Sequence, residues 1–333
     1  METLKPSVLR QRAEESLQAA AYDPRRLVLI HTAVSLGSSL LVAVLNFILS
    51  QKIADTSGLA GMGLQTMLAT VQGVLDTVVM LALPFWNISL LFAALQWVRR
   101  EYAGPGCLLQ GFRRLGGVIG IKFVTGIIYF ALGTAVFYVS LTVFMMTPFS
   151  RPMMEVFEPY ITESMTQEQL YALMTPELIA EASKHCVPAL ILFGVLFIIA
   201  AIPVFYRLRF AEFSVMDDTS AIGAVIKSFQ MTRRNAFRVF RLDLQFWWFY
   251  LLQFLSVALC YGDTILPMLG ITFPFSDEVA FFLFYVLGVL CQGVLLWLAQ
   301  ASVSATYGEA YRALDRTPPK VKTPTPTPLW ENE

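Results

Sequence analysis

Six long apolar runs, separated by short charged intervals, leave this sequence few possible folds. A membrane-spanning helix needs about 20 apolar residues to cross about 30 Å of hydrocarbon, because its backbone N–H and C=O groups must be satisfied within the segment. The runs cover approximately residues 27–50, 71–97, 117–146, 187–206, 240–262 and 279–303. We therefore expect an all-α, polytopic membrane protein whose six transmembrane helices form one domain over residues 27–316.

The composition agrees with a membrane protein and excludes several other classes. Only 14% of the residues are charged, whereas about a quarter are charged in soluble proteins. The formal net charge is zero, so nothing favours a nucleic acid partner. The cysteines are scattered without metal-ligand spacing, and we expect no metal site and no cofactor. The four are Cys107, Cys186, Cys260 and Cys291.

The lysines and arginines predict how the chain is oriented. Most of the 24 lie in the N-terminal segment, the second loop, the fourth loop and the C-terminal tail. Cytoplasmic loops of membrane proteins carry such an excess of positive charge. We therefore expect a multi-pass protein of the cytoplasmic (inner) membrane with both termini in the cytoplasm, as an even number of spans requires.

The segments between the spans have distinct predicted structures. Residues 1–26 are expected to form an amphipathic cytoplasmic helix, and the basic cytoplasmic loop 207–239 to contain another. The acidic outer loop 147–186 predicts a short helical cap, and an acidic lid or cation funnel is the alternative. The tail 317–333 is rich in Pro and Thr, which predicts disorder.

Five cytoplasmic arginines are candidate contacts to membrane lipids. Each cation near an anionic membrane surface gains about 1 kcal/mol. These arginines lie in the second and fourth loops and are Arg113, Arg114, Arg233, Arg234 and Arg238.

A weak internal repeat suggests an ion pair inside the membrane. "CLLQGFRRLGGVIGIKF" from residue 107 and "AVIKSFQMTRRNAFRVFRLDL" from residue 224 both place a Phe and an Arg pair before an outward-running span. Lys122 and Asp243 then occupy equivalent depths. Because an ionisable group within a bilayer is costly, we expect the two to pair. The alternative is that each side chain reaches the interface independently.

A polar seam is a second candidate feature of the fifth span. Arg241, Gln245 and Ser256 share one face of a continuous helix. The seam could admit a polar cargo from the cytoplasm, and the alternative is ordinary hydrogen bonding between helices.

No motif predicts catalysis. The sequence lacks H-E-x-x-H, G-x-S-x-G and Walker-type glycine loops. Its two histidines, His31 and His185, fall on opposite sides of the expected membrane. We therefore expect no enzymatic activity.

The second half of the chain carries a family resemblance. "YRLRFAEFSVMDDTSAIGAVIKSFQMTRRNAFRVFRLDLQFWWFYLL" and "ASVSATYGEAYRAL" resemble the bacterial integral membrane proteins grouped as domain of unknown function 975. The resemblance implies a six-helix inner-membrane fold, and the family has no established activity to carry over. The residues at matching places are Tyr206, Asp217, Ala224, Ser228, Phe237, Trp247, Tyr307 and Tyr311.

Two functions are consistent with these observations. The first is a non-enzymatic scaffold, envelope-related protein or subunit that works with membrane lipids and an unknown membrane-protein partner. The alternative is a small transporter or permease that uses the Lys122–Asp243 pair and the polar seam.

Overall fold

Every regular element of the computed structural model is a helix within the residues that the structure describes, which are 5–54, 59–157, 185–268, 274 and 277–315. The long helices are α2 (Pro24–Ala54), α3 (Leu59–Arg99), α5 (Leu115–Met145), α9 (Val187–Leu208) and α15 (Asp277–Leu314). The shorter ones are α1 (Pro6–Gln18), η2 (Pro105–Leu109), α4 (Gln110–Arg113), η3 (Pro148–Ser150), α6 (Arg151–Phe157), α10 (Ala211–Met216), α11 (Ala221–Thr232), α12 (Ala236–Gln245), α13 (Trp247–Cys260) and α14 (Gly262–Met268).

Five helices are long and apolar enough to cross a membrane, and a bent pair could supply a sixth. The five are α2, α3, α5, α15 and the region from α9 into α10. The bent pair is α12 and α13, whose axes differ by 67°. The prediction of several apolar spanning helices is thus confirmed, but the single straight helix expected over 240–262 is wrong.

The break between α12 and α13 lies at Phe246. Its N–H donates to the Asp243 carbonyl oxygen at 2.9 Å, three residues back, which ends α12 with a tight turn. The ring is 2% exposed, so packing against the core holds this residue in place. Beyond the break, α13 has 14 residues, a length of about 21 Å at 1.5 Å per residue.

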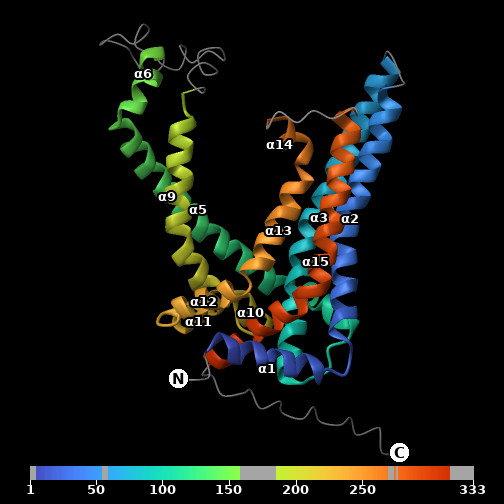
Figure 1. Cartoon of the computed structure of the whole chain (residues 1–333), viewed down its shortest axis with the longest axis vertical. Coiled ribbons are helices and arrows are strands. Elements are labelled where there is room, and N and C mark those ends of the chain that lie inside the picture. The colour runs from blue at the N-terminus through green and yellow to red at the C-terminus, as the bar shows by residue number, and fades with distance from the viewer. Residues whose placement is uncertain (1–4, 55–58, 158–184, 269–273, 275–276, 316–333) are drawn as a thin grey trace, which may run out of the picture.

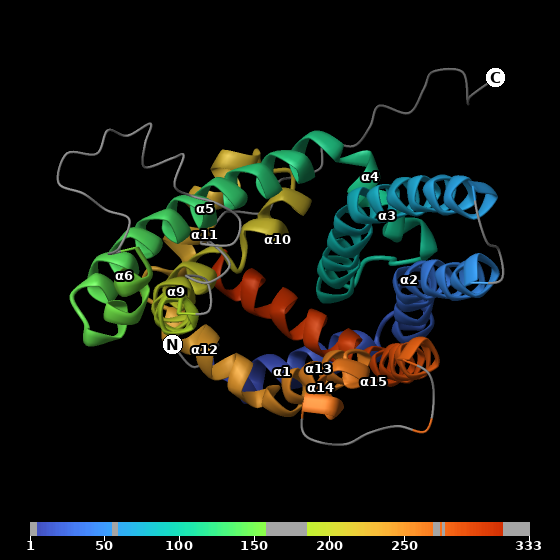
Figure 2. The ribbon, with the colours of Figure 1, turned by 90° about the horizontal axis from the view of Figure 1, so that it is seen from above.

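The helices form two arms that diverge from a common base (Figure 1). The α5–α9 arm contains α5, α6 and α9, and the four-helix arm contains α2, α3, α13 and α15. Both views separate them (Figure 2). We call the end where α1, α10, α11, α12 and the last turns of α15 gather the basal end.

The buried core lies at the basal end. Nearly every residue of α15 from 301 to 311 is buried, as are five of the six residues of α10. In the arms most apolar side chains face outward, and none of the most apolar window of α9 is buried. An arm of this kind leaves its apolar surface for a surrounding apolar medium, as a membrane span does.

Two predicted segments fall mainly outside the described residues. The helical cap was expected within the acidic loop 147–186, of which residues 158–184 are not described. The tail 317–333 is likewise outside them.

A close backbone approach connects α4 to α3. The Gly111 N–H donates to Ser89 Oγ at 2.8 Å, and that hydroxyl donates to the Phe85 carbonyl oxygen at 2.8 Å. A Cβ atom at Gly111 would collide with this carbonyl oxygen. The contact therefore requires glycine.

Gly111→Ala should destabilise the purified protein by about 1–3 kcal/mol, the usual cost of overpacking a tight site. The matched control is Gly106→Ala, because a Cβ there would meet nothing within 4 Å. Thermal unfolding in detergent measures both variants. Equal melting temperatures for the two would contradict the close approach.

Candidate functional site

A polar network occupies the basal end at the point where the two arms diverge. Arg209 follows the last turn of α9 and places Nη2 3.2 Å from Tyr250 Oη and 3.7 Å from Asp243 Oδ1. Tyr250 Oη lies 3.2 Å from Asp243 Oδ1 and 3.1 Å from Tyr307 Oη. We call these four residues the floor network.

The hydrogen bonds of Tyr250 determine which group donates and which accepts in the floor network. A phenol has one proton to donate and two lone pairs. The carboxylate of Asp243 can only accept, so the Tyr250 proton points to it. Arg209 donates to the Tyr250 oxygen, and Tyr307 must therefore be the donor in the tyrosine pair.

Aromatic rings enclose the charge of Arg209. Its guanidinium carbon lies 4.3 Å from the ring centroid of Tyr307 and 5.0 Å from that of Phe205. The side chains of Arg209 and Asp243 are 24% and 14% exposed. Partial burial removes hydration from both charges, so each depends on the other for stability.

The predicted pair between Lys122 and Asp243 is not formed. Lys122 Nζ instead contacts Glu212 Oε1 at 2.5 Å, while Asp243 pairs with Arg209. The physical reason is the order of packing, because α10 lies against α5 whereas α12 packs against α9 and α1. The repeat placed the two residues at similar depth but could not show which helices adjoin.

The predicted polar seam is also not formed. Arg241 is exposed and stacks on Phe237, with its guanidinium carbon 4.7 Å from the ring centroid. Ser256 donates to the Leu252 carbonyl oxygen of its own helix at 2.8 Å. Gln245 ends α12, and the 67° bend that follows separates its helical face from that of Ser256.

Five arginines were predicted to contact membrane lipids. Four of them have exposed or half-buried side chains at the protein surface, and the fifth bonds within the protein. Arg113, Arg233 and Arg234 are exposed, and Arg238 is half-buried.

Arg114 is the exception, because its guanidinium bonds within the protein. It pairs with Asp218 at 2.9 Å and donates to the carbonyl oxygens of Val215 and Met216. Arg114 therefore ties the start of α5 to the end of α10, and its guanidinium is engaged within the protein, unlike those of the exposed arginines.

A pocket of about 250 Å³ opens beside the floor network, and we call it the floor pocket. Three helices of the four-helix arm, α3, α13 and α15, form it together with Arg209 and α10, and apolar side chains such as Phe213 and Val303 complete its wall. Its polar lining residues are Arg209, Glu212, Tyr250, Gln253, Gln300, Ser304 and Tyr307. The pocket therefore offers both signs of charge and several neutral hydrogen-bonding groups next to the apolar arms.

Sequence reasoning missed Arg209, Glu212 and Tyr250 as members of this site. The signal was present, since "YRLRFAEF" places charges three residues apart directly after an apolar run. Charges with that spacing share a helical face. Tyr250 gave no signal, because its role depends entirely on tertiary partners.

A second polar cluster surrounds the end of α15. Asp217 accepts from Arg99 Nη2 at 2.7 Å and from Tyr311 Oη at 3.2 Å. Lys227 Nζ donates to Asp315 at 2.8 Å and to Tyr311 at 3.1 Å. Burial alone would lower the pKa of Lys227, but these hydrogen bonds outweigh it and raise the pKa above its ordinary value. Lys227 therefore holds its charge in this cluster.

Within the described ranges, His, Cys, Asp and Glu side chains form no group of three or more that could hold a metal ion.

Neither the protein-family models, nor the curated proteins, nor the solved structures contain a match to this chain. The resemblance to the domain of unknown function 975 family therefore stays a prediction. Several of its residues do have contacts in the structure. Tyr307 belongs to the floor network, Asp217 and Tyr311 to the second cluster, and Ser228 donates to the Arg207 carbonyl oxygen at 2.6 Å.

Asp243→Asn should lower the stability of the protein by about 1–3 kcal/mol, because it leaves the partly buried Arg209 without its counter-charge. Glu212→Gln is the control, since Glu212 and Lys122 are 35% and 47% exposed and an exposed pair contributes about 0–1 kcal/mol. Thermal unfolding compares the two. A larger loss in the control would contradict the central place of Asp243.

A charge exchange tests which carboxylate faces Lys122. Lys122→Glu should destabilise the protein because two carboxylates then face each other, and adding Glu212→Lys should restore most of the loss. The comparison pair, Lys122→Asp with Asp243→Lys, should show no recovery, since position 243 faces Arg209. Recovery in the second pair only would support the pairing predicted from the repeat.

Proposed function

We propose that the protein is a non-enzymatic, lipid-binding scaffold of the bacterial cytoplasmic membrane, in which the floor pocket receives the polar head of a phospholipid. One observation carries the proposal. A pocket with cationic, anionic and amide groups lies between Arg209 and α10, which follow α9 of one apolar arm, and α3, α13 and α15 of the other. A molecule that matches both the polar pocket and the apolar arms has a polar head and long apolar chains.

The chemistry of the floor pocket suits a phospholipid head. Arg209 can donate to phosphate oxygens through its planar fork, and Glu212 can accept from an amine or a hydroxyl. Gln253, Gln300 and Ser304 add neutral donors and acceptors. The outward-facing apolar side chains of the arms would contact the acyl chains.

The orientation in the membrane is part of the proposal. The basal end carries most of the arginines outside the apolar helices, which supports its placement in the cytoplasm with both termini. On α11 the exposed Ile222, Ile226 and Phe229 share a face, and Phe237 and Trp247 are exposed nearby. Such a face supports contact of α11 and α12 with the membrane surface.

A partner-subunit role is the second candidate. The observation that favours it is the α5–α9 arm, whose α9 buries no residue of its most apolar window. An unburied apolar arm can accept a spanning helix of another membrane protein as well as lipid. The transporter alternative has less support, because the Lys122–Asp243 pair and the polar seam on which it rested are not formed.

Filling the floor pocket tests lipid binding. Gln253→Trp places a large ring inside the pocket, and Phe254→Trp is the matched control because Phe254 is 68% exposed on the same helix. Native mass spectrometry after exchange into a mild detergent measures retained phospholipid. We expect wild type and Phe254→Trp to retain a lipid and Gln253→Trp to lose at least three quarters of it.

Equal retention by all three proteins, or no retained lipid in wild type, would contradict the proposal. If a second polypeptide is retained in place of lipid, and the Gln253→Trp variant still retains it, the partner-subunit role is favoured instead.

A further inference from the structure

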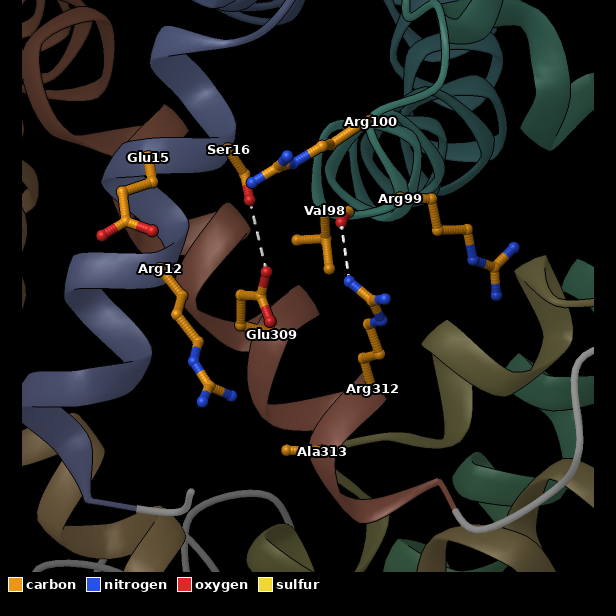
Figure 3. Close-up of a pocket in the computed structure, with 9 residues that line it drawn as sticks. All are labelled: Arg12, Glu15, Ser16, Val98, Arg99, Arg100, Glu309, Arg312 and Ala313. Atoms are coloured by element: carbon orange, nitrogen blue, oxygen red, sulfur yellow. Dashed lines mark hydrogen bonds between the residues drawn. The ribbon is translucent and has the colours of Figure 1, made fainter. Parts of the chain in front are cut away.

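A second and larger pocket lies at the basal end, away from the floor pocket. It measures about 660 Å³, and three segments far apart in the sequence line it. These are α1, the end of α3 and the last turns of α15 (Figure 3). Four arginines contribute to the lining, and they are Arg12, Arg99, Arg100 and Arg312. We call it the arginine pocket.

Three of the four arginines surround a single buried carboxylate. Glu309 is 6% exposed and accepts from Ser16 Oγ at 3.3 Å. Arg312, Arg12 and Arg100 are its electrostatic neighbours. One carboxylate cannot neutralise three guanidinium groups, so the pocket keeps a positive surplus.

The remaining charges at the rim do not remove this surplus. Arg99 points away from the pocket and pairs with Asp217 at 2.7 Å. Glu15 is exposed and accepts from the neutral Gln11 amide at 3.0 Å, so it keeps its charge, and together with Glu309 it leaves a surplus of one positive charge.

Two guanidinium groups of the pocket are free to bind a ligand. Among the described residues, the side chains of Arg12 and Arg100 make no direct ion pair or hydrogen bond, and both are exposed. Arg312 uses Nη1 to donate to the Val98 carbonyl oxygen at 3.1 Å, which fixes its position in the wall. Figure 3 shows the Arg100 side chain extending from the end of α3 toward Ser16 on one side of Glu309, and the Arg12 side chain extending from α1 past its other side.

The backbone at Arg100 adopts a conformation in which glycine is the usual residue. Arg100 has φ of 57°, in the left-handed region that favours glycine. Its N–H donates to the Trp97 carbonyl oxygen at 3.0 Å, and the Glu101 N–H donates to that of Gln96 at 2.9 Å. This pair of bonds is the Schellman motif, in which glycine is the usual residue at the position of Arg100.

An arginine at this position is strained relative to glycine. Strain of this kind is concentrated at functional sites. The left-handed turn directs the Arg100 side chain across the pocket toward Ser16 (Figure 3). The same turn with glycine would leave this side of the pocket without a cation.

We propose that the arginine pocket binds a dianionic phosphoryl group. A tetrahedral phosphoryl group accepts hydrogen bonds from several directions, as guanidinium groups from α1, α3 and α15 would require. Because the Coulomb energy scales with the charge of the ligand, the positive surplus attracts a dianion more strongly than a single carboxylate. The pocket is larger than inorganic phosphate alone, so it accommodates a phosphate monoester.

The phosphoryl group could belong to a water-soluble phosphate ester or to a lipid with a terminal phosphate. The site is separate from the floor pocket, since the two share no lining residue. It therefore goes beyond the proposed lipid-head site and does not depend on it. A ligand here would bridge α1 to the ends of α3 and α15.

Binding is measured by isothermal titration calorimetry on the full chain in detergent at low ionic strength. The soluble ligands are inorganic phosphate and glycerol 3-phosphate. The lipid ligand is dihexanoyl phosphatidic acid, with dihexanoyl phosphatidylglycerol as the phosphodiester control. We expect saturable binding of a soluble ligand, of phosphatidic acid, or of both, and the tighter binding identifies the source of the phosphoryl group.

Arg100→Gly separates binding from stability. Glycine relieves the left-handed backbone, so the variant should melt at or above the wild-type temperature while its affinity falls at least tenfold. Arg12→Gln should also weaken binding at least tenfold. Glu309→Gln should strengthen it, because the competing carboxylate is removed. Arg234→Gln is the control, as Arg234 is an exposed arginine outside the pocket.

The results expected above support the phosphoryl site. Absence of saturable binding of both the soluble ligands and phosphatidic acid overturns it, and so does unchanged affinity in Arg100→Gly. Equal weakening in Arg100→Gly and Arg234→Gln would show general charge attraction and overturns it as well. Equal binding of phosphatidylglycerol and phosphatidic acid, with no soluble binding, would contradict dianion recognition.

Discussion

The burial of the last turns of α15 is the interaction on which the rest of the structure depends. Helix α15 as a whole packs against α1, α2, α3 and α13, and small residues in its last turns allow a close approach to α3. Ala305 is fully buried, and a Cβ atom at Gly308 would lie 3.0 Å from Val98 and 3.3 Å from the Ala94 carbonyl oxygen. Small residues let helix backbones approach where larger ones would keep them apart. Because Tyr311 of α15 also packs against Phe210 and Phe213, which follow α9, the arms above can diverge without losing the core.

The spanning helices could be predicted because they depend on local composition alone. A run of apolar residues long enough for the bilayer is visible in any sequence, and five such runs are helices in the structure. The bend at Phe246 could not be predicted in this way. Neither Pro nor Gly marks it, and "RLDLQFWWFYLL" continues the apolar run without a visible stop. Tertiary packing of the buried Phe246 ring holds the bend, and the seam from Arg241 to Ser256 fails because it assumed one straight helix.

The candidate sites were harder to predict than the helices, because they depend on which segments adjoin. The sequence indicated that Lys122 and Asp243 are unusual, and both are paired in the structure, each with a different partner. Arg100 illustrates the same limit. In "VRREYAGPG" glycine follows only at position 104, yet the left-handed residue is an arginine four positions earlier. Only the backbone of the folded chain distinguishes this arginine from its neighbour Arg99.

The last turns of α15 also belong to both pockets. Tyr307 donates into the floor network, whereas Glu309 and Arg312 line the arginine pocket. Tyr311, one turn further, bonds Asp217, which holds Arg99 beside the same pocket. These residues lie within two turns of one buried helix, and a packed helix moves as a unit because its interior contacts cannot stretch individually. A ligand that shifts this helix must therefore move Tyr307 as well, or else be accommodated by the exposed arginines of α1 and α3. The free side chains of Arg12 and Arg100 make the second route the less costly one, since they can adjust to a ligand without disturbing the core.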